Sequence, residues 1–279
     1  MKRRYFNSKI LLFGEYTVLV DGTALGIPFK AYYAQWKFDG SRTKDKSLNG
    51  FYKYLLSTFP KTFDASNFDN EILNGLRLDA SIPIGKGLGS SAALTAAVYD
   101  RYFFNPSEDL NVLQSTFSKM EAYFHGTSSG FDPLIIYLDS AIKRSNHGVQ
   151  MIEKDLKCNF NCFLFDSKIP RQAHQLIPLF KSKLKEANFT AVIKELKSLN
   201  EVCINGIFDE FDIFESIKSI SMLQFKYFKE MIPESVASYW QKGMDTEQYY
   251  MKLCGAGGGG YFLLFTTSDF QASDSIKIF

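Results

Sequence analysis

The 279-residue sequence predicts an α+β fold, and three patterns carry this prediction. Apolar runs that end at clusters of glycine indicate strands followed by tight loops. Apolar residues spaced alternately three and four positions apart indicate amphipathic helices. Strands and helices mix in the first half of the chain, whereas helices precede strands in the second half, which suggests two α+β layers. A chain of this length fits one large domain or two small ones, and we expect two, at residues 1–150 and 151–279.

The first elements are expected to be strands. The apolar segment at residues 9–20, KILLFGEYTVLV, predicts two short strands around Gly14, and the Asp-Gly pair that follows is a turn signal. Residues 78–84 predict another strand. After it, the glycines of residues 85–91 indicate a loop and the alanine-rich run at 92–98 indicates a helix.

Helices dominate the middle of the chain. One apolar stripe with spacings of three and four consists of Leu110, Leu113, Phe117, Met120 and Phe124. The pair Asn105-Pro106 supplies an N-cap and a first-turn proline for this helix. Further helices are predicted at residues 189–202, 213–231 and 233–244. Strands are expected at residues 162–165, 249–254 and 261–265.

Composition and charge exclude several classes of protein. The 32 Lys and Arg residues nearly balance the 30 Asp and Glu residues, so the chain has no global field for nucleic acid or an anionic membrane. No stretch approaches the ~20 apolar residues of a membrane span. The scattered cysteines disfavour a zinc site and a disulfide framework and favour a reducing compartment. They are Cys158, Cys162, Cys203 and Cys254. We therefore expect a cytoplasmic protein without nucleic-acid or membrane partners.

Residues 85–93, GKGLGSSAA, are the first motif with a chemical meaning. Glycine permits a positive φ and lets the backbone approach a ligand closely. The helix that follows offers free N–H groups and the positive end of its dipole, and these features together suit phosphate groups. Ser90 and Ser91 serve either as helix caps or as metal ligands, and Lys86 either contacts phosphate or is solvated. The motif is neither a Walker loop nor the dinucleotide-binding GxGxxG.

Two other segments are unusual. Glu121 lies beside the apolar stripe of its helix, and Asp132 stands just before the apolar run 134–138. A carboxylate at such a point favours a perturbed pKa and a defined role. The alternative is an N-cap aspartate with a surface glutamate. Five glycines among residues 255–260 indicate a close approach of the backbone to another group, with a bare glycine hairpin as the alternative.

Three motifs, in this order, resemble those of the GHMP kinase family. Residues 83–93, PIGKGLGSSAA, match the second motif of the family in full, and residues 255–260, GAGGGG, match the third. The first motif, Lys-x-x-x-x-Gly-Glu, corresponds to Lys9 through Glu15. The resemblance covers nearly the whole chain. It implies a two-domain GHMP kinase fold, with an N-terminal half like ribosomal protein S5 domain 2 and a ferredoxin-like C-terminal half.

Within the family, the chain is most similar to the mevalonate kinase branch. Glu121, His125 and Asp132 have the spacing of that branch, and residues 167–171, SKIPR, also resemble it. Tyr16 departs from the histidine that is usual there, and resembles the first motif of phosphomevalonate kinases. We expect its phenol to donate a hydrogen bond to the acceptor.

The resemblance implies a role for each motif. ATP is expected at Gly85, Lys86, Gly87, Leu88, Gly89, Ser90, Ser91 and Ala92. Mg²⁺, which prefers oxygen ligands, is expected on Ser91 and Glu121. Asp132 would accept the proton of the acceptor hydroxyl, and Lys9 would keep it ionised and stabilise charge on the attacking oxygen. Contacts with the small-molecule acceptor are expected from Glu15, Tyr16, His125 and Gly257.

The identity of the acceptor stays open at this point. Mevalonate, phosphorylated to 5-phosphomevalonate in isoprenoid biosynthesis, is the first candidate. Phosphomevalonate is the second because of Tyr16, and such an acceptor needs basic residues, for which Lys30, Lys86 and Arg171 are available. A sugar or heptose phosphate is the third. The His-Gly and Asp segment disfavours a decarboxylase of diphosphomevalonate, and the full set of motif residues disfavours a non-catalytic regulator. The chain is expected to be a monomer or a homodimer.

Overall fold

The computed structural model describes residues 4–41, 45–154, 156, 158–171, 173–267, 269–270 and 273–279. The chain forms two compact units. The first consists of Met1–Lys9, Ile27–Ile84 and Leu88–Ala141, and the second of Ile10–Gly26, Gly85–Gly87 and Ile142–Phe279. Each unit combines strands and helices, which confirms the α+β fold. The domain limits expected from the sequence, at residue 150, stay a prediction.

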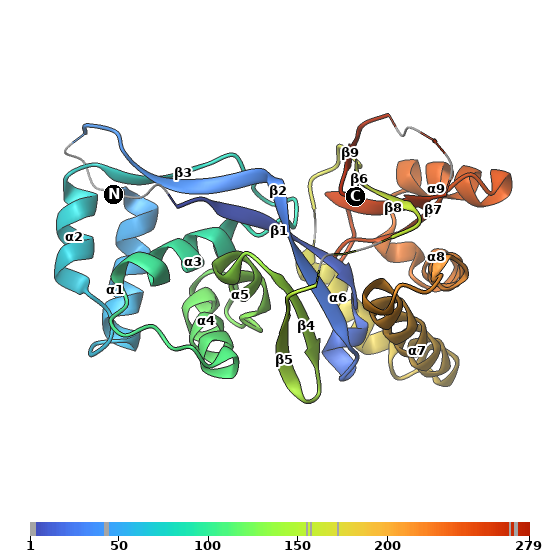
Figure 1. Ribbon diagram of the computed structural model, residues 1–279, viewed down its shortest axis with the longest axis horizontal. Coiled ribbons are helices and arrows are strands. Elements are labelled where there is room, and N and C mark those ends of the chain that lie inside the picture. The colour runs from blue at the N-terminus through green and yellow to red at the C-terminus, as the bar shows by residue number, and fades with distance from the viewer. Residues whose placement is uncertain are drawn as a thin grey trace. The chain divides into compact units, whose positions relative to one another are not determined.

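In the first unit, helices lie along one face of a sheet (Figure 1). Strand β2 pairs antiparallel with β3, so that Ala34 lies opposite Ala80 and Phe38 opposite Leu76, and β1 lies beside β2. The strands are β1 (Phe6–Phe13), β2 (Ala24–Phe38) and β3 (Leu76–Ala80), the first two of which continue into the second unit. The helices are α1 (Lys46–Thr58), α2 (Ala65–Leu73), α3 (Ser90–Tyr102), α4 (Leu110–His125) and α5 (Phe131–Leu138).

Helix α3 is rich in small residues, which lets its neighbours α4 and α5 pack closely against it. Ala92, Ala93, Ala96 and Ala97 are all fully buried. The ring of Tyr99, on α3, also contacts Phe117 of α4 and Tyr137 of α5, with centroids 4.9 and 5.2 Å away. This packing fixes the first turn of α3 relative to the two helices beside it.

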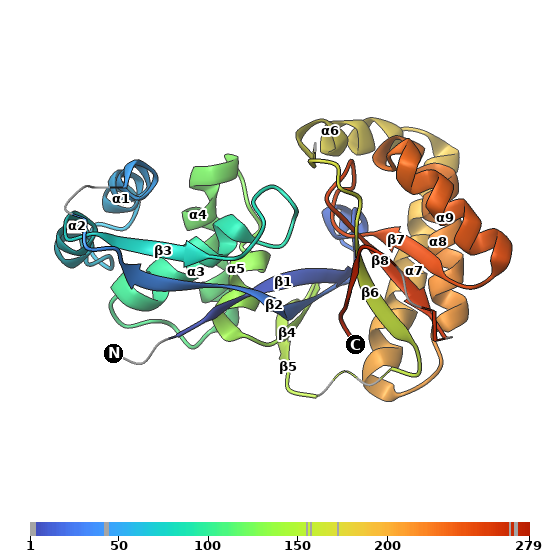
Figure 2. The ribbon, with the colours of Figure 1, turned by 90° about the horizontal axis from the view of Figure 1, so that it is seen from above.

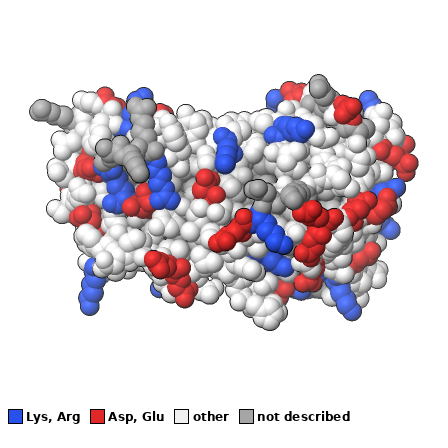
Figure 3. All heavy atoms as spheres, viewed as in Figure 1, with Lys and Arg blue, Asp and Glu red and all other residues white. Residues whose placement is uncertain are grey.

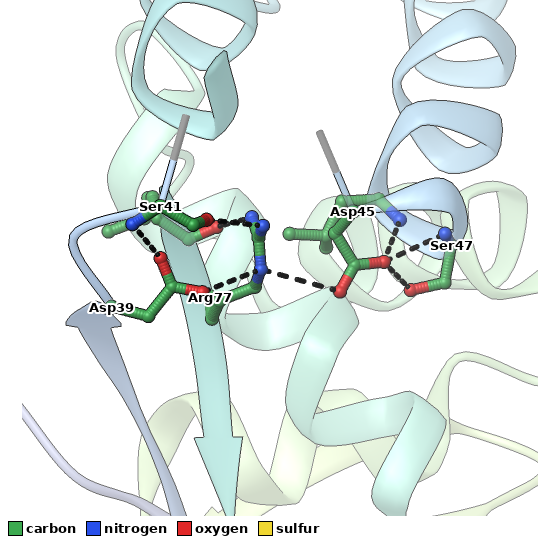
Figure 4. A network of polar contacts seen from close by, with 7 residues as sticks. Asp39, Ser41, Asp45, Ser47 and Arg77 are labelled. Carbon is green, nitrogen blue, oxygen red and sulfur yellow. Dashed lines mark hydrogen bonds and ion pairs between the residues drawn. The ribbon is translucent and has the colours of Figure 1, made fainter. Parts of the chain in front are cut away.

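A polar network anchors the chain before α1 (Figure 4). Arg77 of β3 places its Nε 3.3 Å from Asp39 Oδ2 and 3.9 Å from Asp45 Oδ2. Its Nη2 donates to Ser41 Oγ at 3.1 Å. Asp45 is also the N-cap of α1, and accepts a hydrogen bond from the backbone N–H of Ser47 at 2.8 Å. One guanidinium thus joins the end of β2 to the start of α1.

In the second unit, an antiparallel sheet has the strand order β7-β8-β6-β9. Helices α8 and α9 contact β7, and α7 packs on α8 (Figure 2). Strand β4 pairs with β2, with Ala24 opposite Arg144. The strands are β4 (Ala141–Ser145), β5 (Gly148–Ile152), β6 (Asn161–Asp166), β7 (Tyr250–Leu253), β8 (Tyr261–Thr266) and β9 (Ser275–Lys277). The helices are α6 (Ala173–Lys183), α7 (Ala187–Asp209), α8 (Phe214–Tyr227) and α9 (Glu234–Thr246), with a 3-10 turn at Lys229–Met231.

Most elements lie where the sequence predicts them, but two local expectations are wrong. Tyr16 has a φ of 61°, and the chain continues into a 3-10 helix, Thr17–Val20, in place of a second strand. Helix α4 does not begin at the Asn105-Pro106 pair. Its N-cap is Asp109, whose carboxylate accepts from the N–H of Val112 at 3.1 Å, whereas Asn105 has a φ of 50° in the preceding loop.

Acidic and basic side chains are interspersed on the face of the molecule that is drawn in Figure 3. Among the described residues, none of the helices has the length and apolar composition that crossing a membrane requires. All four cysteines are free thiols. Burial raises the pKa of Cys158 and of Cys203 to about 12, and raises that of Cys162 well above its usual range.

Candidate active site

The N-terminus of α3 carries no side-chain cap. Its N-cap is Gly89, which has a φ of 87° and no side chain to bond the first N–H groups. Ser90 and Ser91 therefore do not cap the helix, and free N–H donors and the positive end of the helix dipole remain at this point. A Cβ on Gly89 would lie 3.0 Å from Ile136 Cδ1 and 3.1 Å from Lys9 Cγ. The tight space and the positive φ together favour glycine here.

Lys9 and Asp132 form an ion pair near this helix end. Lys9 Nζ lies 2.7 Å from Asp132 Oδ2. Strand β1 holds Lys9 in place, and its backbone N–H donates to Leu88 O at 3.1 Å. The Lys9 side chain is only 8% exposed, whereas that of Asp132, in the first turn of α5, is 38% exposed. An accessible carboxylate fixed by a buried ammonium suits a group that exchanges a proton with a ligand.

Glu121 is buried near the end of α4. Ser128 Oγ donates to its Oε2, and Ser91 Oγ lies 3.5 Å from its Oε1. Burial, followed by the Asp132 carboxylate, raises the pKa of Glu121 to about 7, while the bond from Ser128 and the charge of Lys9 act in the opposite direction. The surface glutamate considered as an alternative is therefore wrong. A buried carboxylate next to a like charge is one that a bound cation would stabilise.

His125 and Gly130 complete the connection between α4 and α5. His125, the last residue of α4, places its Nε2 3.0 Å from Ser91 Oγ. Gly130, with a φ of 67°, is the N-cap of α5, and a Cβ there would lie 2.1 Å from Gln114 O. Because backbone cannot yield as a flexible side chain does, this glycine fixes the position of α5 on α4. The carboxylates of the two helices are held together as a result.

The oxygens of Ser91 and Glu121 fit a small divalent cation. Mg²⁺ takes oxygen ligands and is usually held by one or two carboxylates together with water and substrate phosphates. The Ser91 hydroxyl beside the buried Glu121 carboxylate supplies donors of this kind. Within the part of the chain that the structure describes, no group of three or more His, Cys, Asp or Glu side chains forms a metal cage. Mg²⁺ bound at Ser91 and Glu121 would take further ligands from substrate phosphates and water.

The first part of the glycine loop belongs to the second unit. Gly85 and Gly87 have φ values of 73° and 86°. Lys86 Nζ lies 2.7 Å from Asp166 Oδ1 and 5.6 Å from the centroid of the Tyr261 ring. The lysine thus has a carboxylate partner within the protein, and its predicted contact with phosphate stays a prediction.

The glycine run 255–260, between β7 and β8, packs backbone against backbone. A Cβ on Gly257 would lie 2.4 Å from Met231 O, and one on Gly259 would lie 2.7 Å from Pro170 O. The close approach that the sequence predicts is therefore made to the protein's own main chain, so this is not a bare hairpin. The predicted contact of Gly257 with substrate stays a prediction.

Glu15 forms a second ion pair, which is sealed inside the second unit. Lys252 Nζ lies 2.5 Å from Glu15 Oε1, and both side chains have no exposed surface. Lys252 also donates to the carbonyls of Leu12 and Leu253, each at 2.9 Å. Burial raises the pKa of Glu15, and the charge of Lys252 opposes this rise. A substrate contact of Glu15 stays a prediction.

Tyr16 is buried in an aromatic cluster. Its ring lies 4.7 Å from that of Phe180 and 5.4 Å from that of Phe228, measured between centroids. Its Oη donates to Ala256 O at 2.6 Å. A phenol has one proton to give, and in this arrangement that proton goes to the glycine run. The predicted hydrogen bond to the acceptor stays a prediction.

Sequence reasoning missed three residues that shape these sites. Ser128 and Gly130 lie in a small, polar loop whose sequence does not reveal which group bonds the carboxylate of Glu121. The sequence indicates Lys252 only weakly, as the single charged residue in the apolar strand segment YYMKLC. A charged residue in a buried strand indicates a partner carboxylate, but the sequence does not name Glu15 as that partner.

Comparisons with known proteins bear on the fold of the chain. Residues 49–140 match the family model of the GHMP kinases N terminal domain. No curated protein matches the chain. The fold is similar to that of L. major mevalonate kinase in complex with R-mevalonate, with a TM-score of 0.68 and 16% identity over 96% of this chain and 88% of that one. It is also similar to Streptococcus pneumoniae phosphomevalonate kinase, with a TM-score of 0.64 and 17% identity over 100% and 98%. For Lactococcus lactis galactokinase complexed with galactose, the TM-score is 0.62 and the identity 14%, over 96% and 86%.

Residues 49–140 are thus similar to the N-terminal domain of GHMP kinases, and the whole chain has a fold like that of solved kinase structures. The three sequence motifs resemble those of the same family. One structure with this fold is that of Streptococcus pneumoniae phosphomevalonate kinase in complex with phosphomevalonate and AMPPNP.

Proposed function

We propose that the chain transfers the γ-phosphate of ATP to the hydroxyl of mevalonate and forms 5-phosphomevalonate. The observation that carries this proposal is the Lys9–Asp132 ion pair, 2.7 Å long, beside the uncapped N-terminus of α3. The spacing of Glu121, His125 and Asp132 supports the mevalonate branch of the family. The fold likeness to a mevalonate kinase is compatible with this acceptor but does not select it.

The phosphates of the nucleotide would bind to backbone N–H groups that no side chain caps. The first N–H groups of α3 lack a side-chain cap, and the dipole of the helix favours negative charge at this end. Ser91 and Glu121 would hold Mg²⁺, which neutralises charge on the phosphates when it is bound. A hydrogen bond between His125 Nε2 and Ser91 Oγ, which are 3.0 Å apart, would orient that hydroxyl.

Asp132 and Lys9 would handle the acceptor. The carboxylate of Asp132, which is 38% exposed, would accept the proton of the acceptor hydroxyl. Lys9 pairs with that carboxylate at 2.7 Å and stabilises negative charge on the attacking oxygen. Phosphoryl transfer depends on positioning and charge more than on covalent chemistry, so the rigid connection of α4 to α5 contributes by holding these groups.

Phosphomevalonate is the second candidate acceptor. The Gly14-Glu15-Tyr16 form of the first motif supports it, since this form resembles phosphomevalonate kinases. Its additional phosphate requires a cation that is not already neutralised by a carboxylate of the protein.

The test is a comparison of acceptors with one enzyme preparation. ADP release is measured with mevalonate, phosphomevalonate, homoserine, galactose and a heptose phosphate. We expect the highest kcat/KM for mevalonate. A higher value for phosphomevalonate would select the second candidate. Turnover of a sugar alone would reject both, and the absence of ADP release with every acceptor would favour a non-catalytic member of the family.

A further inference from the structure

The two oxygens of the Glu121 carboxylate have different neighbours. Oε2 accepts a hydrogen bond from Ser128 Oγ, whereas Oε1 lies 3.5 Å from Ser91 Oγ. All three residues belong to the Leu88–Ala141 part of the first unit. A donor of the protein therefore occupies one oxygen, and the other lies beside the hydroxyl with which it would share a cation. The bond to Oε2 thus fixes the side on which Oε1 is offered.

A backbone group determines the direction of the Ser128 hydrogen bond. The N–H of Gly130 donates to Ser128 Oγ at 3.0 Å. An N–H can only donate, whereas a hydroxyl accepts and also has one proton to give. Ser128 Oγ therefore accepts from Gly130 and directs its own proton to Glu121. An ionised carboxylate, which only accepts, is the partner that this arrangement suits.

The loop that carries Ser128 is anchored to the helix that carries Glu121. Ser118 Oγ donates to the carbonyl oxygen of Ser128 at 2.6 Å. Gln114 Nε2 donates to the carbonyl oxygen of Ser129 at 3.0 Å. Ser118 and Glu121 are three positions apart on α4, so they are neighbours on the surface of the helix. The donor and the carboxylate that it bonds are thus both attached to α4, which restricts the movement of one relative to the other.

We propose that Ser128 is a positioning residue for the divalent cation: by holding Glu121 Oε2, it keeps Oε1 beside Ser91 and so increases the affinity of these two oxygens for the metal. This inference rests on the proposed function, in which Mg²⁺ binds at Ser91 and Glu121. A carboxylate that is already oriented loses less rotational freedom when a cation binds than one that is free to turn. Removing such a hydrogen bond from a metal-binding group typically weakens metal binding by about ten- to a hundredfold.

The first test measures cation binding without turnover. Mn²⁺, which suits the same oxygen ligands, is the probe, and electron paramagnetic resonance measures its free concentration in titrations with and without AMPPNP. We expect Ser128→Ala to raise the dissociation constant of Mn²⁺ by about ten- to a hundredfold. Ser128→Thr, which keeps the hydroxyl, should recover most of this loss. Glu121→Gln is the reference variant, because it removes the carboxylate itself.

Ser129→Ala is the matched control. It deletes the neighbouring hydroxyl from the same loop, and that hydroxyl accepts a hydrogen bond from the backbone N–H of Phe131 at 3.3 Å. Because this bond does not involve Glu121, we expect Mn²⁺ affinity to change by less than about twofold. Thermal melting of every variant verifies that it is folded, and separates a disturbed loop from a lost cation.

A double-variant cycle tests whether Ser128 acts through Glu121. It is done with AMPPNP, whose phosphates still hold the ion when the carboxylate is removed. In the Glu121→Gln background, Ser128→Ala should have no further effect on Mn²⁺ binding, whereas two independent effects would add. In turnover assays, Ser128→Ala should raise the Mg²⁺ concentration for half-maximal rate and leave the acceptor KM at saturating Mg²⁺ unchanged.

Unchanged or tighter Mn²⁺ binding by Ser128→Ala overturns the inference, and so does an equal loss in Ser129→Ala or in the Glu121→Gln background. It also fails if the wild-type protein binds no Mn²⁺, or binds it as well after Glu121→Gln, because no cation is then held by Glu121. If the wild-type protein binds Mn²⁺ through Glu121 but turns over no acceptor, the proposed function fails, while these titrations still decide the role of Ser128.

Discussion

Two lysine–carboxylate pairs of similar length have different surroundings. Lys9 and Asp132 are 2.7 Å apart in the first unit, and Lys252 and Glu15 are 2.5 Å apart in the second. Asp132 is 38% exposed, whereas the other pair has no exposed surface at all. The Lys252 ammonium group also donates hydrogen bonds to two backbone carbonyl oxygens. Access, and not ion pairing as such, separates a group available for chemistry from one that holds the fold.

The largest effect is expected from Asp132→Asn, because the amide cannot accept the proton of the acceptor. We expect kcat to fall by about a hundred- to ten-thousandfold, with little change in ATP binding. The melting temperature should stay close to that of the wild-type protein, since the side chain is partly exposed. Stopped assays under saturating substrates measure kcat. A variant that keeps more than about a tenth of the activity would remove Asp132 from the mechanism.

Disruption of the buried pair Lys252–Glu15 should lower the stability of the fold. Lys252→Met leaves Glu15 buried without its partner, and we expect a loss of about 3–5 kcal/mol in the free energy of unfolding. Urea denaturation measures it. The double variant Glu15→Leu/Lys252→Met is the matched control, and should recover part of the loss because no unpaired charge remains. A loss below about 1 kcal/mol in the single variant would contradict a structural role for this pair.

Glu121 makes stability depend on pH, and the sign follows from the direction of its shift. Its pKa is raised to about 7 from the usual 4.5, so the folded state binds more protons than the unfolded chain between these values. Stability is therefore highest below pH 4.5 as far as this group is concerned, and falls by about 3 kcal/mol as the pH rises to 7.

Denaturation of the protein without nucleotide or divalent cation, at several pH values, measures this slope. Glu121→Gln should flatten it. Asp132→Asn should flatten it in part, because the Asp132 charge is the second cause of the raised pKa. A slope that Glu121→Gln leaves unchanged would show that another group titrates.

The smallest effect is expected from Tyr16→Phe. Its hydroxyl bonds Ala256 O, and a neutral hydrogen bond contributes about 0.5–1.5 kcal/mol to stability. The acceptor KM should change by only a few fold. The sequence alone favours a direct bond to the acceptor, for which the rise would be about ten- to a hundredfold. Steady-state kinetics on this variant thus decide which oxygen receives the phenolic proton during turnover.

Local patterns predict much of the fold. The stripe at 110–124 predicts a helix that the structure has at Leu110–His125, and the apolar runs around the glycines 255–260 predict the pair β7 and β8. Helices α1, α2, α5 and α6 and strand β2 were not predicted. The polar loops are less predictable, as Asp109 and Asn105 show, because several residues in one loop are good caps and tertiary packing selects among them.

The sequence predicts only part of the candidate site. Lys9 by itself has the pattern of an ordinary strand lysine, and only the family resemblance paired it with Asp132. Glu15 and Lys252 are far apart in the chain, so no local pattern brings them together.

Three of the native cysteines are expected to react slowly with labelling reagents. Alkylating reagents attack the thiolate, and burial keeps Cys158, Cys162 and Cys203 protonated at neutral pH. A cysteine introduced at an exposed position such as Met222, which is 54% exposed on α8, would therefore react with maleimide probes far faster than these three native residues. A fluorophore or spin label can be attached in this way without first deleting these three cysteines.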